Sequence, residues 1–263
     1  MSYETLNFDV ADGIARITLN RPKRFNALNL PMAKELMEIS IACDEDDGIR
    51  CVILTGAGDK AFCAGGDLID FDGDERGLPV VMKETTTYLH AAVSRFSRMG
   101  APFIGSINGV AAGAGISLAA CVDLAIAADT ARFVSAYTAA GLSPDGSSTY
   151  FLPRLVGMRR YLELAMTNRQ LSAAEALDWG IVNKVVPAAE LESETMALAR
   201  HLADGPTATF GRVKQLAHNS FSDTLESQME LETRLIADAG RSEDGREGIA
   251  AFAAKRKPAF KGR

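Results

Sequence analysis

The segment Ile107–Leu118, INGVAAGAGISL, decides the fold because its small residues stand where an apolar strand runs into a helix. An upstream segment, Ala61–Leu68 (AFCAGGDL), also follows an apolar strand and is built in the same manner. Few bulky side chains separate a ligand from the backbone N–H groups of these two turns. Each turn therefore offers a donor to one ligand oxygen, the arrangement that stabilises an oxyanion. Taken singly, each glycine is explained equally well by a tight turn or close packing.

Hydrophobic patterning around these turns predicts alternating strands and helices. A hairpin turn at Asp12-Gly13 joins the first two expected strands, and the apolar run Cys51–Thr55 is typical of a strand covered on both faces. The expected strands are 3–9, 13–19, 51–55, 102–107 and 122–127, and the expected helices are 31–44, 81–98, 114–121, 207–219 and 222–241. The pattern beyond residue 173 is almost wholly helical. We expect an α/β fold with mainly parallel sheet, a core domain over 1–200 and a C-terminal helical region over 201–263 for assembly.

Composition excludes several classes of protein. The chain has 263 residues, of which 47% are hydrophobic, and no apolar run is long enough to span a bilayer. The N-terminus has no secretory pattern, so we expect a soluble cytoplasmic protein without a membrane partner. Four isolated cysteines and three scattered histidines predict no disulfide and no metal. A net charge of −6 disfavours nucleic acid, although the run Lys255-Arg256-Lys257 offers local basic charge.

Several segments together resemble the crotonase (enoyl-CoA hydratase/isomerase) superfamily. They are Asn20-Arg21-Pro22 with Asn26-Ala27-Leu28, Phe62–Leu68, Ile107–Leu118, Gly141–Gly157, Ala173–Val182 and Phe252–Arg256. The resemblance covers essentially the whole chain. It implies a spiral of strand–strand–helix repeats and a homotrimer or homohexamer built through the C-terminal helices. It also implies an acyl-CoA thioester as substrate, with no separate cofactor.

By this resemblance, the backbone N–H groups of Gly66 and Ala114 are the oxyanion donors. Ala114 is expected at a helix N-terminus, whose partial positive charge favours an enolate. The positions that contact CoA in the family correspond to Arg24, Ala27, Leu28, Ala64, Asp67 and Leu68, together with Phe252 and Lys255, which often reach the CoA of a neighbouring subunit. A lysine suits the phosphates of CoA, but the last two residues are equally explained as surface residues.

The chain departs from the family's hydratases at their two catalytic glutamates. The first of these positions falls on Ser117 and the second on Tyr137. Neither side chain is a good general base near neutral pH, since a tyrosine hydroxyl titrates near ~10 and serine far higher. Water addition by the two-glutamate mechanism is therefore not expected.

Asp145, in Ser143-Pro144-Asp145-Gly146, corresponds to the catalytic aspartate of other branches. These include 1,2-epoxyphenylacetyl-CoA isomerases, some enoyl-CoA isomerases and 4-chlorobenzoyl-CoA dehalogenases. One carboxylate suffices to take a proton at one carbon and return it at another. The alternative interpretation is a helix start, with Ser143 as N-cap, Pro144 at the first helical position and Asp145 complementing the helix dipole.

His90 corresponds in position to a histidine of the dehalogenase branch, although a lone helical histidine is more often a packing or surface residue. That branch has tryptophan at Tyr137 and phenylalanine at Gly66, so dehalogenation is a minority hypothesis. We expect Tyr137 and His90 in the wall of the acyl pocket; Tyr137 is otherwise explained as a buried, hydrogen-bonded tyrosine. An isomerase with Asp145 as proton shuttle is favoured over a hydratase that uses Asp145 and a water. A non-catalytic acyl-CoA-binding or RNA-binding member is the alternative from another class.

Overall fold

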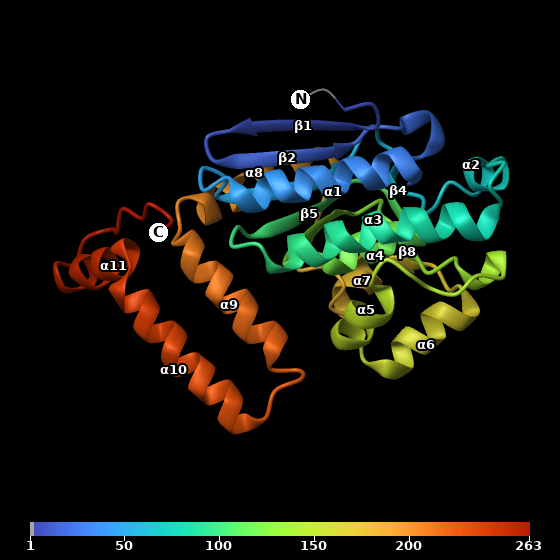
Figure 1. Ribbon diagram of the computed structural model, residues 1–263. Coiled ribbons are helices and arrows are strands. Elements are labelled where there is room, and N and C mark those ends of the chain that lie inside the picture. Colours follow the sequence, from blue (N-terminus) through green and yellow to red (C-terminus); the bar gives the residue numbers. More distant parts are fainter. Residues whose placement is uncertain (1–2) are drawn as a thin grey trace.

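Two β-sheets flanked by helices form the body of the protein, and three helices near the C-terminus extend from it (Figure 1). This computed structural model describes residues 3–263, so residues 1 and 2 of the expected core region lie outside the described residues. The strands are β1 (Leu6–Ala11), β2 (Ile14–Leu19), β3 (Cys51–Gly56), β4 (Ala61–Cys63), β5 (Phe103–Ile107), β6 (Val110–Ala112), β7 (Leu124–Ala128), β8 (Arg132–Val134), β9 (Leu171–Ser172) and β10 (Lys184–Val186).

The α-helices of the described residues follow the expected positions closely in the long segments and add several short ones. They are α1 (Leu30–Glu45), α2 (Leu68–Asp72), α3 (Leu78–Arg98), α4 (Ala114–Cys121), α5 (Ser148–Val156), α6 (Met158–Thr167), α7 (Ala173–Asp178), α8 (Leu191–Ala203), α9 (Thr207–Asn219), α10 (Leu225–Arg241) and α11 (Glu243–Ala253). Local signals explain their starts: the Asn29 side chain, for example, accepts the backbone N–H of Met32 and caps α1.

The larger sheet has the strand order β1-β2-β3-β5-β7-β10 and is parallel except for the β1–β2 hairpin. Every residue of β3 is buried, as expected for a strand covered on both faces. Val52 and Leu54 pack with residues of α1 and α3, whereas Cys51 and Ile53 pack with Ala199 of α8 on the opposite face. The sheet therefore lies between two helical layers.

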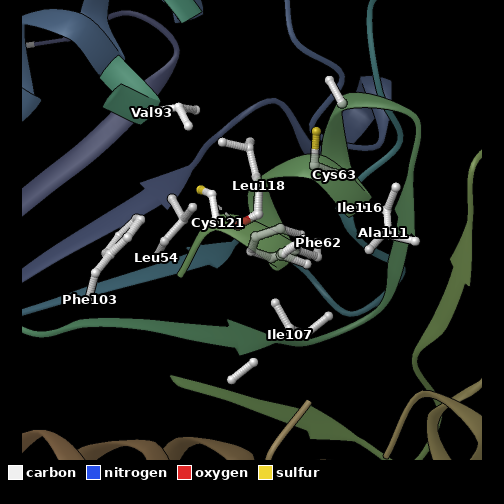
Figure 2. Close-up of a cluster of buried hydrophobic side chains, with 14 of the residues drawn as sticks. Leu54, Phe62, Cys63, Val93, Phe103, Ile107, Ala111, Ile116, Leu118 and Cys121 are labelled. Carbon is white, nitrogen blue, oxygen red and sulfur yellow. Dashed lines mark hydrogen bonds between the residues drawn. The ribbon is translucent and has the colours of Figure 1, made fainter. Parts of the chain in front are cut away.

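The smaller sheet has the order β4-β6-β8-β9 and carries the two glycine-rich turns. Strands β4 and β6 are parallel neighbours, so their carboxyl ends lie at one edge of the sheet. Behind that edge lies a cluster of buried side chains that includes Phe62, Ile107 and Leu118 (Figure 2). These short strands differ from the expectation, as does β10, which lies within the segment expected to be helical.

Helices α9, α10 and α11 extend away from the sheets (Figure 1). These helices expose large apolar side chains: Val213, Leu225, Met229, Ile236, Ile249 and Phe252. No helix within residues 3–263 has the length and apolar character needed to cross a membrane.

The four cysteines are buried free thiols. Burial raises the pKa of Cys63 to about 11 and the pKa of Cys43, Cys51 and Cys121 to about 12. These thiols therefore stay protonated near neutral pH in the folded protein.

Candidate active site

The two glycine-rich turns touch through their backbones. Gly65 has φ +101°, and a Cβ at this residue would lie 3.0 Å from the carbonyl oxygen of Ala112 and 3.4 Å from Cα of Gly113. Gly113 has φ +51°, and Ala114 is the first residue of α4. Any side chain at residue 65 would therefore force apart the turns that carry the N–H groups of Gly66 and Ala114. Within residues 3–263, no backbone or side-chain acceptor receives the Gly66 N–H.

The glycine-rich turn that contains Gly65 and Gly66 is held in place by the segment that precedes α1 and by a buried ion pair. The N–H of Leu28 donates to the carbonyl of Gly65 at 2.7 Å, and the N–H of Asp67 donates to the carbonyl of Leu28 at 2.8 Å. The Asp67 carboxylate is 4% exposed and lies 2.6 Å from an Arg24 nitrogen and 2.9 Å from an Arg21 nitrogen. Burial alone would raise the pKa of Asp67, but hydrogen bonds from Arg24 and the neighbouring backbone hold it below its usual value. Asp67 is thus an ionised anchor of this turn.

Both turns open into one cavity of about 380 Å³. Gly66 and Ala114 lie in its wall, and most of the remaining wall is apolar: Leu28, Leu68, Phe71, Met82, Leu89 and Leu142. Asp145 is the sole carboxylate of the described residues in this wall. An apolar cavity with a few convergent polar groups is the usual form of a small-molecule site.

Asp145 is held by the hydroxyl groups of Tyr137 and Ser117. The phenol of Tyr137 lies 2.7 Å from Oδ1 of Asp145, and Oγ of Ser117 lies 3.0 Å from the same phenol oxygen. An ionised carboxylate only accepts, so Tyr137 donates to Asp145 and Ser117 can donate to Tyr137. Burial, and then the charge of Asp145, raise the pKa of Tyr137 above its usual value. Tyr137 therefore acts as a neutral donor that orients the carboxylate.

The loop that carries Asp145 packs tightly on α4. Oγ of Ser117 lies 3.1 Å from the backbone carbonyl oxygen of Asp145, an alternative acceptor for its one proton, and a Cβ at Gly146 would lie 3.0 Å from Cβ of Ser117. Helix α5 begins at Ser148, with Ser147 in the N-cap position. Asp145 therefore precedes the helix, and the interpretation of Ser143-Pro144-Asp145 as a helix start is wrong. The loop turns Asp145 toward the cavity instead of extending the helix.

His90 lies on α3 on the other side of this loop. Its Nε2 accepts the N–H of Gly146 at 3.2 Å, which corresponds to a neutral ring with its proton on Nδ1. His90 does not line the 380 Å³ cavity; it lines a larger cleft of about 1120 Å³ between the core and the C-terminal helices. Asp145 lines both. Within residues 3–263, no hydrogen bond joins the side chains of His90 and Asp145.

Comparison with known proteins identifies the family. Residues 9–263 match the family described as enoyl-CoA hydratase/isomerase. The chain belongs to the enoyl-CoA hydratase/isomerase family, within the crotonase superfamily. It is 43% identical over 255 residues to the 1,2-epoxyphenylacetyl-CoA isomerase of Escherichia coli, covering 97% of each chain. It is 41% identical over 264 residues to a probable enoyl-CoA hydratase of Rhodobacter capsulatus, covering 100% of each.

The fold is the crotonase fold. The crystal structure of an enoyl-CoA hydratase from Bacillus anthracis matches with a TM-score of 0.92 at 32% identity, and the match covers 99% of this chain and 100% of that one. The resemblance to the superfamily is therefore confirmed.

The residues predicted to contact CoA fall into two groups. Leu28, Ala64 and Leu68 line the cavity, and Ala27 adjoins Leu28. The side chains of Arg24 and Asp67 are paired with one another at the same turn. Phe252, by contrast, lies in α11, and Lys255 follows two residues after the end of that helix. Helix α11 is at the opposite end of the molecule from α2 (Figure 1). Within one chain, they are not brought to the cavity.

Two features of the site were missed from the sequence. Ser117 was noted only as a lost glutamate, yet it contacts both Tyr137 and Asp145. Helix α3 also supplies a wall of the cavity through Met82, Thr85, Thr86 and Leu89. Their spacing of three or four residues marks one face of a helix, which was a readable signal.

Proposed function

We propose that this protein is an acyl-CoA isomerase that moves a double bond with Asp145 as its proton shuttle. The observation that carries the proposal is that Asp145, alone among the carboxylates of residues 3–263, shares the cavity with the N–H groups of Gly66 and Ala114. The positions of the two hydratase glutamates hold Ser117 and Tyr137, which support Asp145 through hydrogen bonds.

In this mechanism, the thioester oxygen of a 3-enoyl-CoA accepts hydrogen bonds from the N–H groups of Gly66 and Ala114. The Asp145 carboxylate takes a proton from C2, and the electron pair delocalises onto the thioester oxygen as a dienolate. The same carboxyl group then returns the proton at C4, which gives the 2-enoyl-CoA without consuming water. One oxyanion donor contributes about 2.7–4 kcal/mol to such a transition state. A general base contributes about 10²–10⁴-fold in rate.

A second candidate is isomerisation of a ring 1,2-epoxyphenylacetyl-CoA. It is favoured by the 43% identity to an enzyme of that name along 97% of both chains. The same oxyanion donors and the same aspartate would act on this thioester. Halide displacement is less well supported, because it requires His90 and Asp145 to face one another, and His90 instead bonds the loop backbone at Gly146.

The CoA-binding and assembly proposals rest on the C-terminal helices. We propose a homotrimer, or a hexamer made of two trimers, in which the exposed apolar residues of α10 and α11 are covered by a neighbouring subunit. Phe252 is 87% exposed, so it is available to a neighbour's CoA together with Lys255. Sedimentation equilibrium checks this: a monomer at micromolar concentration contradicts it. A cytoplasmic location remains part of the proposal.

The experiment that tests the activity is mass spectrometry of 3-enoyl-CoA incubated with the protein in deuterated water. We expect the double bond to migrate without a gain of water, and deuterium to enter at C4 only to the extent that the protonated Asp145 exchanges with solvent before it returns the proton. A product heavier by one water would instead support hydration by Asp145, and an unchanged substrate would refute this isomerase activity.

The matched variants are Asp145→Asn and Asp178→Asn. Asparagine keeps an acceptor for Tyr137 but removes the base, so we expect turnover to fall about 10²–10⁴-fold while acyl-CoA binding is retained. Asp178 is exposed and lies outside the cavity wall, so its variant should turn over normally. Equal turnover by both variants would contradict the role of Asp145, whereas acyl-CoA binding without turnover by the wild type would support a non-catalytic acyl-CoA-binding protein.

A further inference from the structure

Thr85 lies in the wall of the acyl cavity with a buried hydroxyl that has no hydrogen-bond partner. Its residue is 3% exposed, and its Oγ1 is unpartnered within residues 3–263. The two threonines that follow behave differently, since Thr86 and Thr87 both donate to the carbonyl of Lys83, at 3.1 and 2.7 Å. Such back-bonding is the ordinary outcome for threonine in a helix. Thr85 thus keeps an unused hydroxyl in a wall that is otherwise largely apolar.

An unpartnered buried hydroxyl is unfavourable, because it loses its hydrogen bonds to water and gains none in return. Valine has nearly the same shape and would fill this position without that cost. A group bound in the cavity would supply the missing partner once rotation about χ1 turns the hydroxyl toward it. Threonine in a helix has two accessible χ1 rotamers, so its hydroxyl and its methyl group can exchange places.

Thr85 lies one helical turn away from the part of α3 that faces the loop of Asp145. One helical turn later, Leu89 lies beside the loop of Asp145, with its Cδ2 3.5 Å from where a Cβ of Gly146 would be. Thr85 is four residues earlier, about 6 Å along the axis of α3. In the proposed mechanism the reacting carbons lie beside Asp145, and we therefore place Thr85 against a more distant part of the acyl group.

We propose that Thr85 is a specificity-determining residue that hydrogen-bonds an oxygen carried by the acyl group beyond its reacting carbons. The preferred substrates are then acyl-CoA thioesters with an ether, epoxide or hydroxyl oxygen, in contrast to plain hydrocarbon enoyl-CoA. This inference rests on the proposed function, because it uses the same cavity and the same placement of the thioester. The hydroxyl can donate to or accept from that oxygen.

The test compares 3-octenoyl-CoA with analogues in which the methylene at C6 or C7 is replaced by an ether oxygen. We expect kcat/KM to favour one ether analogue over the hydrocarbon, and Thr85→Val to reduce that preference about fivefold to tenfold, the value of one hydrogen bond. Thr85→Ser keeps a hydroxyl and should retain the preference. Thr87→Val is the matched control, because Thr87 lies outside the cavity wall and its hydroxyl already has a partner. The same preference in wild type and Thr85→Val overturns the proposal.

Binding measurements separate this inference from the proposed function. Dissociation constants of the saturated octanoyl-CoA and its C6 or C7 ether analogues give the same ratio without any turnover. If no thioester isomerises but Thr85→Val still lowers the binding preference for an ether, the proposed function fails and the role of Thr85 stands. Thr85→Val should unfold at the same or a higher temperature, because the buried hydroxyl has no partner to lose. Should that variant fail to fold, Thr85→Ala replaces it in the same comparison.

Discussion

Replacing Lys214 by methionine should destabilise the protein strongly, because this lysine joins α9 to the core. Lys214 is 8% exposed, and its Nζ lies 2.8 Å from Oδ2 of Asp123. The same nitrogen donates to the carbonyls of Phe96 and Ala101, at 3.1 and 3.2 Å. Its three protons are therefore all used. Methionine keeps much of the side-chain length but removes every one of these donors.

The expected loss is worked from the group left behind. Removing one partner of a buried ion pair costs about 3–5 kcal/mol, because the other charge stays buried without compensation. Asp123 is 20% exposed and still accepts the backbone N–H of Phe103 at 2.8 Å. Both features reduce the loss in the free energy of unfolding, so we expect a loss of about 3 kcal/mol, near the lower limit of that range.

The loss should also depend on pH. Burial raises the pKa of Asp123 above its unfolded value of 3.8 even with Lys214 present. Without Lys214, the charged form is disfavoured further. A raised pKa in the folded state means that stability is lost as pH rises from 3.8 through the folded pKa. The destabilisation by Lys214→Met should therefore be smaller at about pH 5 than at about pH 8.

Urea unfolding followed by circular dichroism measures these free energies, on the variant and on Lys214→Met/Asp123→Asn. The double variant should recover part of the loss, because its side chain at residue 123 carries no charge. Lys184→Met is the matched control: Lys184 pairs with Glu194 at the surface, and its loss should be at most about 1 kcal/mol. A loss below about 1 kcal/mol for Lys214→Met, or one that is equal at both pH values, would refute the reasoning.

Three further predictions concern the frame of the site. Gly115→Ala places a Cβ 2.0 Å from the carbonyl oxygen of Cys63, so we expect a loss of about 3 kcal/mol in urea unfolding despite alanine's better helix propensity; a stabilised variant would contradict this contact. Asp67→Asn should destabilise at neutral pH, and since the folded pKa of Asp67 is lowered from 3.8, the deficit should vanish as pH falls below that value; a pH-independent deficit argues against the ion pairs. Ser172→Ala removes the N-cap of a capping box with Glu175 and should cost about 1 kcal/mol, whereas an unchanged midpoint would count against the cap.

The sequence predicted the long elements well where hydrophobic period and punctuation agree. The helix expected over 114–121 is α4 itself, and the apolar run from Cys51 is a strand buried on both faces. The contact between Gly65 and Gly113 could be anticipated, because two similar turns each follow an apolar strand. The short strands β4, β6 and β8 could not be predicted, because a strand of three residues is too short to show a hydrophobic period. Their pairing also depends on partners that are distant in the sequence.

The site was predicted less completely because its contacts are long-range. Asp145 was singled out, but its sequence neighbours Ser143 and Pro144 are also those of a helix start, and only tertiary packing on Ser117 decides against that. The same packing turns the loop toward Tyr137. The expectation that His90 lines the acyl cavity followed from its order along the chain, whereas helix rotation directs it to the larger cleft. Nothing in the local pattern of α3 reports that rotation relative to a loop 55 residues later.

Because the four thiols are buried and protonated in the folded chain, the rate at which a reagent modifies them reports how often the interior opens. A thiol reagent in excess can modify them only during moments when the sheet and its helices part. The labelling rate of Cys63, which lies beside the glycine turns, would time the opening of the reaction chamber. The rate of Cys51, buried on the face toward α8, would time events on the opposite side of the sheet. One chain thus carries separate reporters for two regions, which mass spectrometry of the digested, labelled protein tells apart.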